Sequence, residues 1–232
     1  MRLYRAVMVH DWGGQIAGTR ISMQTGLCFG IVLAGGLSRR MGGGDKALRK
    51  LGGTSLLARV IAALRPQCEG LVMSANGDPA RLTDFAFPVI DDDVQGFKGP
   101  LAGILAGLDW IAAHRPDVEL AISAAADTPF LPDDLTARLK VARAKNNAMA
   151  ACARSGGRTH PLATLWPVAI RRELRQALVE KDIRKAGDFL HDYRCATVDW
   201  PVEPFDPFFN INEPGDLSAA EAILSRREAH IA

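Results

Sequence analysis

A glycine-rich, basic segment follows directly after a short apolar run near the start of the chain. The apolar run is Cys28–Leu33, and the segment after it, Ala34–Lys46, holds five glycines together with Arg39, Arg40 and Lys46. Glycines let backbone N–H groups approach a ligand closely, and converging amides form a cavity for anions. A guanidinium matches phosphate oxygens in shape, and a lysine ammonium acts as a point charge. These residue types predict a loop that holds a triphosphate.

Two common phosphate-binding motifs do not fit this segment. A Walker A loop ends in Gly-Lys-Ser/Thr, whereas here Gly44 is followed by Asp45-Lys46-Ala47. A dinucleotide fingerprint requires Gly-x-Gly-x-x-Gly, which the segment also lacks. A surface loop with solvated charges is the alternative, and the position directly after a buried strand argues against it.

One aspartate marks a second place where chemistry is expected. Asp127 follows the apolar stretch Ile122–Ala126 and precedes a turn at Pro129. An ionised carboxylate at the end of an apolar strand needs a partner. Mg²⁺ prefers oxygen ligands and is often held by one or two carboxylates together with phosphates. The position therefore predicts a magnesium-binding carboxylate, with an aspartate that caps the turn as the alternative.

The elements that must position these residues alternate between strand-like and helix-like patterns. We expect strands over Cys28–Leu33, Leu71–Ala75, Val89–Ile90 and Val118–Ala126, and helices over 54–64 (capped by Thr54), 101–113 and about 133–145. Such alternation is typical of an α/β domain with three αβα layers, in which helices cover both faces of a mostly parallel sheet. Ligands bind beyond the carboxyl ends of strands in these sheets, so the loop and Asp127 are expected at one edge.

Length, charge and cysteine usage narrow the class of protein. The chain has 232 residues, enough for one large domain, and its net charge of +2 argues against a nucleic-acid partner. No stretch reaches the roughly 18 to 20 apolar residues that a membrane span needs. The four cysteines lie far apart without a Cys-x-x-Cys pair, so neither a zinc site nor a disulfide framework is expected. The cytoplasm is the expected compartment.

Residues 1–27 are interpreted as a leader. It is either disordered or the result of an upstream translation start, in which case Met23 is the functional start. Met1–Arg5 is basic, but the apolar run Ala6–Val9 is too short for a signal peptide. The domain is expected over residues 28–232, with the nucleotide in its N-terminal part and the acceptor side over about 148–212.

The chain resembles the molybdenum cofactor guanylyltransferases. Leu33–Lys46 is similar to the family signature Leu-Ala-Gly-Gly-x-Ser-x-Arg-Met-Gly-x-Asp-Lys, lengthened or shifted slightly at Gly42–Gly44. The similarity covers about residues 29–228, and it continues through Asp91-Asp92, Gly99–Gly103, Asp127-Thr128-Pro129, His160-Pro161-Leu162 and Asn210–Pro214. It implies a Rossmann-like nucleotidyltransferase fold, with transfer of GMP from GTP to the molybdopterin form of the molybdenum cofactor and release of pyrophosphate.

The resemblance also implies roles for individual residues. Arg40, Lys46 and Asp127 are implied as catalytic, and Asp127 also as the ligand of Mg²⁺. The nucleotide-binding residues are implied to be Leu33, Ala34, Gly35, Lys46, Ser74, Asp92 and Asp127. Ser74 stands in the register of a family asparagine, with Asn76 two residues on. Acceptor-side residues are implied to be Arg158, His160, Arg184, Asn210 and Asn212.

Three alternatives stay open at this point. One is a cytidylyltransferase of the same cofactor pathway, and another is a sugar-phosphate nucleotidylyltransferase. The third belongs to another class: a non-catalytic nucleotide- or cofactor-binding chaperone module. GTP and molybdopterin are the expected ligands in the first interpretation, with molybdoenzymes or their chaperones as possible protein partners. For single residues, His160 has a structural alternative, and Asn210 and Asn212 have the alternative of shaping a turn before a helix.

Overall fold

The computed structural model describes residues 26–35, 45–94 and 99–231, with side chains up to residue 226. Most of the proposed leader, Arg39 and Arg40 lie outside the described residues. No described helix is both long and apolar enough to cross a membrane.

One seven-stranded sheet forms the centre of the molecule, in the order β5-β4-β1-β6-β8-β7-β9. Neighbouring strands are parallel except at β8, which runs antiparallel to both β6 and β7. The predicted mostly parallel sheet is therefore confirmed. The strands are β1 Cys28–Leu33, β4 Leu71–Ser74, β5 Val89–Ile90, β6 Leu120–Ala125, β7 Ala150–Ser155, β8 Arg158–Pro167 and β9 Cys195–Trp200.

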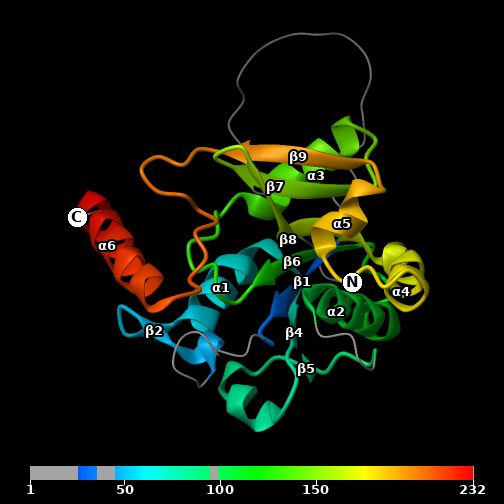
Figure 1. Ribbon diagram of the computed structural model, residues 1–232, viewed down its shortest axis with the longest axis horizontal. Coiled ribbons are helices and arrows are strands. Elements are labelled where there is room, and N and C mark those ends of the chain that lie inside the picture. Colours follow the sequence, from blue (N-terminus) through cyan, green and yellow to red (C-terminus); the bar gives the residue numbers. More distant parts are fainter. Residues whose placement is uncertain (1–25, 36–44, 95–98, 232) are drawn as a thin grey trace, which may run out of the picture.

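Helices cover both faces of the sheet (Figure 1). One face is covered by α1 Leu56–Leu64 and α3 Leu135–Lys145, and the other by α2 Pro100–His114, α4 Arg171–Glu180 and α5 Ala186–His191. The three αβα layers agree with the expected fold class. The last helix, α6 Pro214–Ile231, packs against the small hairpin of β2 Lys50–Leu51 and β3 Thr54–Ser55. Short 3-10 turns are η2 Lys46–Leu48, η3 Arg65–Gln67, η4 Pro79–Phe85 and η5 Val168–Ile170.

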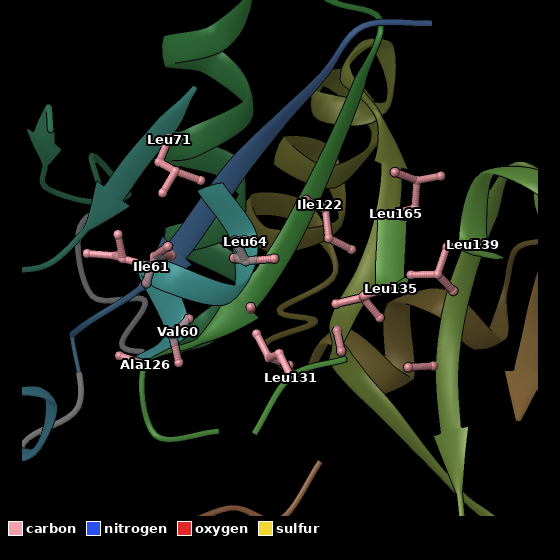
Figure 2. Packing of buried hydrophobic residues seen from close by; sticks show 14 of the residues in the cluster. Val60, Ile61, Leu64, Leu71, Ile122, Ala126, Leu131, Leu135, Leu139 and Leu165 are labelled. Atoms are coloured by element: carbon pink, nitrogen blue, oxygen red, sulfur yellow. The ribbon is translucent and has the colours of Figure 1, made fainter. Parts of the chain in front are cut away.

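The core on the α1/α3 face is built from branched aliphatic side chains. In Figure 2, Leu64 of α1 and Leu135 of α3 lie nearest the strand residue Ile122, whereas Ile61 of α1 lies on the side of Leu71 and Leu139 of α3 on the side of Leu165. Leu64, Leu135, Leu139 and Ile122 are fully buried. Burial of each such side chain contributes about 1.5–3 kcal/mol. The helical spacing of apolar residues that predicted these helices is the spacing that faces the sheet.

Helix α2 lies unusually close to the sheet because two of its residues are glycines. A Cβ at Gly107 would come within 2.7 Å of Ile31, and a Cβ at Gly103 would come within 2.6 Å of the Ser74 hydroxyl. Neither distance leaves room for a methyl group. The glycines of α2 therefore set the distance between this helix and strands β1 and β4.

The predicted helix cap of α1 was wrong by one residue. Ser55 Oγ accepts the backbone N–H of Ala58 at 3.2 Å, which is the usual N-cap contact. Thr54 belongs instead to β3, where it pairs with Leu51. The hairpin of β2 and β3 was not predicted, because strands of two residues leave no periodic pattern to detect.

Candidate active site

The carboxyl ends of β1, β4, β5 and β6 meet at one edge of the sheet. Hydrogen bonds continue one residue beyond the strands: Ala34 N–H donates to Ser74 O at 2.8 Å, and Ala126 N–H to Leu33 O at 3.0 Å. The end of β1, where Leu33, Ala34 and Gly35 lie, is therefore flanked by the ends of β4 and β6. Ala34 is buried and Gly35 is exposed. The strands that precede the loop and Asp127 thus end side by side, and residues 36–44 of the loop lie outside the described residues.

Lys46 brings together two other segments of the chain at this edge. Its Nζ lies 2.5 Å from Asp127 Oδ2 and 2.8 Å from Asn212 Oδ1. Lys46 stands at the first position of η2, whose preceding residue Asp45 accepts the Ala47 N–H through Oδ1 at 3.0 Å. Asp45 also forms an ion pair with Arg81. The hydrogen bond to Ala47 and the ion pair with Arg81 therefore both fix the turn that carries Lys46.

The segment around Asn210 and Asn212 is attached to Asp127 through the backbone. The Ile211 N–H donates to Asp127 O at 3.0 Å, and the Ile211 side chain is fully buried. The N–H groups of Asn212 and Glu213 donate to Asp216 Oδ2, at 2.7 and 2.8 Å. Asp216 therefore caps this end of α6. The side-chain amide oxygen of Asn212 takes no part in this cap and accepts from Lys46.

Asp127 has one carboxylate oxygen that no described group satisfies. Oδ2 accepts from Lys46, whereas the buried Oδ1 has no hydrogen-bond partner among the described residues. A buried acceptor without a partner is costly, by about 1–3 kcal/mol. An oxygen-binding cation at Oδ1 fits this donor set. No group of three or more potential metal ligands occurs in the described part of the chain, so a metal at this place needs ligands from the substrate.

Asn76 and Asp92 form a pair at the ends of β4 and β5. Asn76 Nδ2 donates to Asp92 Oδ2 at 2.9 Å, and the Asp92 N–H donates to Asn76 Oδ1 at 3.1 Å. The side chain of Ser74 is instead buried beneath Gly103 of α2. The polar side chain at this strand end is therefore that of Asn76, two residues beyond the position named from the resemblance.

A cavity of about 220 Å³ is lined by Ala125 and Thr128, the near sequence neighbours of Asp127, and by Asn210. His160 lines it and stacks on Phe208, with ring centroids 4.7 Å apart. Burial lowers the pKa of His160 below its ordinary value, and the nearby Arg158 lowers it further, while Asp206 opposes both. The full lining is Ala125, Thr128, Leu131, Thr159, His160, Pro161, Leu162, Ala163, Phe208 and Asn210.

The remaining acceptor-side residues are less directly connected to this cavity. Arg158 is exposed just after the tight turn Gly156-Gly157 that joins β7 to β8. Arg184 is half-exposed, donates to Asp182 Oδ1 at 2.8 Å and lies with its backbone against Gly99. Of the five residues implied on the acceptor side, His160 and Asn210 line the cavity, and Asn212 contacts Lys46.

Sequence reasoning did not find three residues that organise the cavity: Ser155, Asp206 and Phe208. Ser155 is buried, and its hydroxyl contacts both His160 and Asp206. Ser155 and Asp206 are 51 positions apart along the chain, so no local pattern joins them. The proline-rich segment 201–207 reads as an ordinary connection.

A glycine-rich, basic segment after the first strand, with Lys46 and Asp127 meeting at the carboxyl edge of a mostly parallel sheet, is typical of the nucleotidyltransferase class. The family model of the MobA-like NTP transferase domain matches residues 30–195. A molybdenum cofactor guanylyltransferase from Rhodopseudomonas palustris is 59% identical over 196 residues, which cover 84% of this chain and 93% of that protein. A Bradyrhizobium protein of the same name is 57% identical over 199 residues, with 86% and 94% covered.

A solved structure supports the same assignment. Molybdopterin-guanine dinucleotide biosynthesis protein A from Archaeoglobus fulgidus is 26% identical, with a TM-score of 0.65 over 85% of this chain and 99% of that one. This chain belongs to the MobA-like NTP transferase family, among the molybdenum cofactor guanylyltransferases. Enzymes of this class typically use a divalent metal ion, which agrees with the unsatisfied oxygen of Asp127.

Proposed function

We propose that this chain transfers GMP from GTP to the molybdopterin form of the molybdenum cofactor, giving the guanine dinucleotide cofactor and pyrophosphate. The observation that carries the proposal is the contact of Lys46 with Asp127 and Asn212 at the carboxyl edge of the sheet. It places a cation and a carboxylate beside the loop after β1, where a triphosphate would bind. The names of relatives up to 59% identical agree with this reaction.

The reaction needs positioning and charge stabilisation rather than proton transfer. The terminal phosphate of the acceptor attacks the α-phosphorus of GTP, a new P–O bond forms, and the bond to the β-phosphate oxygen breaks. A phosphate monoester near neutral pH is already ionised, so no general base is required. Lys46 moves from Asp127 to the β- and γ-phosphates and stabilises the charge that develops on pyrophosphate. Arg40, outside the described residues, is proposed to share this role.

Asp127 is left with a free carboxylate when Lys46 turns to the phosphates. Its unsatisfied Oδ1 would hold a divalent cation, for which we propose Mg²⁺. Such an ion, when bound, neutralises charge on the phosphates. The amide oxygen of Asn212 lies near this carboxylate, since both contact Lys46. The backbone hydrogen bond from Ile211 to Asp127 keeps the two segments together.

Guanine is proposed to lie at the ends of β1, β4 and β5. Guanine presents two donors, N1–H and N2–H₂, which suit the Asp92 carboxylate. The reciprocal hydrogen bonds with Asn76 hold that carboxylate in place. The backbone of Leu33, Ala34 and Gly35 forms the adjoining wall, and buried Ser74 supports it from below.

The acceptor is proposed to occupy the cavity lined by His160 and Asn210, with Arg158 and Arg184 at its margins. The cavity begins next to Asp127, so an acceptor phosphate there would face the α-phosphate of GTP. The four cysteines are all free thiols, in keeping with the proposed cytoplasmic location. Molybdoenzymes or their chaperones are proposed as recipients of the product.

The proposal is tested by incubation of the protein with molybdopterin, Mg²⁺ and each of the four nucleoside triphosphates, with pyrophosphate release as the readout. We expect turnover with GTP. Faster turnover with CTP would assign the chain to the cytidylyltransferases instead. GTP binding without turnover of any triphosphate would identify a binding module.

Asp127→Asn is the matching test of the site. The amide has nearly the same shape but carries no charge, so we expect pyrophosphate release to fall to near background while the thermal midpoint stays close to wild type. Asp133→Asn, at an exposed carboxylate six residues along the chain, is the control and should keep full activity. Wild-type rates for Asp127→Asn at millimolar Mg²⁺ would contradict the role given to this carboxylate.

A further inference from the structure

A continuous chain of hydrogen bonds leads from His160 into the protein interior. The Ser155 Oγ lies 2.7 Å from His160 Nε2 and donates to Asp206 Oδ1 at 2.8 Å. Asp206 Oδ1 also accepts the Phe208 backbone N–H at 2.9 Å. Ser155 is only 1% exposed, so water does not substitute for these contacts.

The proton count of this chain fixes the direction of each hydrogen bond. A serine hydroxyl has one proton to donate and lone pairs to accept with. Asp206 Oδ1 acts as an acceptor, since it already receives the Phe208 N–H. The Ser155 proton is therefore given to Asp206. Ser155 Oγ can then only accept from the ring, which requires that His160 Nε2 carries a proton.

The second ring nitrogen of His160 is left without a partner from the described chain. The hydrogen bond of the ring is made through Nε2, and its face stacks on Phe208. His160 also lines the cavity beside Asp127. Burial lowers the pKa of His160, which favours the neutral ring at neutral pH. In the neutral ring with the proton on Nε2, Nδ1 is a hydrogen-bond acceptor.

We infer that Ser155 and Asp206 hold His160 in the Nε2–H tautomer, so that Nδ1 accepts a hydrogen bond from an N–H or amino group of the acceptor's heterocycle. This inference rests on the proposed function and names a recognition element within it. His160 is the contact residue, and Ser155 and Asp206 are positioning residues. A pterin ring carries such donors on its pyrimidine edge, and a purely phosphorylated sugar does not. The network therefore presents a hydrogen-bond acceptor to the donor-bearing edge of the pterin.

The tautomer is measured directly by long-range ¹H–¹⁵N spectra of the full-length protein labelled at histidine. The His160 signals are assigned by their loss in His160→Asn. Wild type should show a protonated Nε2 and an unprotonated Nδ1. Asp206→Ala frees the Ser155 hydroxyl to donate to Nε2, so the Nδ1–H tautomer should become populated. Asp206→Asn, the matched control, keeps an acceptor oxygen and should keep the wild-type tautomer. An Nδ1–H ring in wild type, or no change in Asp206→Ala, would overturn the inference.

Steady-state kinetics provide the second readout. Asp206→Ala and Ser155→Ala should raise the KM for molybdopterin by about 2- to 10-fold, the range expected for one hydrogen bond. The KM for GTP should stay unchanged in both variants, and Asp206→Asn should behave like wild type. An unchanged KM for molybdopterin, or a parallel rise for both substrates, would count against the inference.

Failure of the proposed function would look different from failure of this inference. A wild-type protein that turns over no acceptor would refute the proposed function and leave the tautomer measurement intact. Addition of a free pterin to the labelled protein then decides the recognition step. A shift of the Nδ1 signal in wild type that Asp206→Ala weakens supports the inference, and no shift in wild type overturns it.

Discussion

At the scale of single residues, the site depends on two opposite charges that are both largely withdrawn from water. The side chains of Lys46 and Asp127 are only 12% and 20% exposed, and their charged atoms are 2.5 Å apart. Each charge would be costly to bury alone, so each stabilises the other in the absence of nucleotide. In the proposed reaction, Lys46 exchanges the Asp127 carboxylate for the phosphates of GTP.

Lys46→Ala should weaken GTP binding more than GMP binding, because the ammonium is proposed to contact the β- and γ-phosphates. A hydrogen bond to a charged group contributes about 1.5–3 kcal/mol, so the GTP affinity should fall by roughly 10- to 100-fold. Isothermal titration with both nucleotides measures the difference. Lys50→Ala, at an exposed lysine of β2, is the control and should change neither affinity. Equal losses for GTP and GMP would place Lys46 away from the distal phosphates.

Asp92→Asn should reduce the preference for GTP over ATP by about tenfold or more, because the carboxylate is proposed to accept from guanine N1–H and N2–H₂, and a hydrogen bond to a charged group contributes about 1.5–3 kcal/mol. Adenine lacks the 2-amino group and has an acceptor at N1, so it offers neither of these donors to the wild-type carboxylate, whose Oδ2 keeps its hydrogen bond from Asn76. Asn76→Ala should act in the same direction, since it removes the hydrogen bonds that hold Asp92. The ratio of kcat/KM for the two nucleotides measures the effect. Asp91→Asn, at the exposed neighbouring carboxylate, should leave the ratio unchanged.

At the scale of elements, α2 packs closely on the carboxyl ends of β1 and β4, and its glycines make this possible. Gly103 lies over Ser74 and Leu33 at the carboxyl ends of β4 and β1, and Gly107 lies over Ile31 one turn further on. Glycines inside a helix normally lower its stability, but here a larger residue at either position would clash with the strands. The gain is a close approach between a rigid helix and the strand ends that carry the site.

The same substitution should have opposite effects in two helices. Gly107→Ala adds a methyl group within 2.7 Å of Ile31, and such overpacking typically costs about 1–3 kcal/mol. Gly215→Ala, in the first turn of α6, meets nothing within 4 Å, so the better helix propensity of alanine should stabilise by up to about 1 kcal/mol. Urea unfolding measures both. A stable Gly107→Ala variant would show that α2 can move away from the sheet.

At the scale of the whole molecule, the segment that contains Asn212 and α6 packs against the β2–β3 hairpin that follows Lys46. Ile211, Ala220 and Leu224 form a cluster with Leu51, Leu56 and Phe130. This cluster fixes the Asn212 backbone beside Asp127 and the hairpin that follows Lys46. The lysine, the aspartate and the asparagine thus come from three distant parts of the sequence, and they meet only when the fold is complete.

The pH dependence of stability should reflect His160, the half-buried histidine that lines the cavity. Burial lowers the folded pKa of His160 below its ordinary value of 6.5. As the pH falls below about 6.5, the unfolded chain binds a proton that the folded chain does not, so stability decreases toward the folded pKa. Thermal midpoints at pH 7.5 and 5.5 should therefore differ more in wild type than in His160→Asn. His191→Asn, at an 89% exposed ring, is the control and should follow wild type.

Much of the fold was predictable because the responsible interactions are local. The apolar runs of β1 and β6 and the helical spacing in α1 and α3 appear in short windows of sequence, and Asp127 was placed correctly at the end of β6. The parallel arrangement follows from the alternation of these elements. Placement of strand ends at one edge then follows for any sheet of this kind.

The sequence by itself determined the layers, the parallel direction of β1, β4, β5 and β6, and the residue types at their carboxyl ends, but not the antiparallel direction of β8. Only the tertiary structure decided which side chains meet there. Ser74 faces α2 while Asn76 reaches Asp92, because the glycines of the helix allow it to cover the strand end. Lys46 and Asn212 meet across 166 positions, and Ser155 reaches Asp206 across 51. Contacts of this kind depend on the packing of the whole domain, and no short window of sequence contains that information.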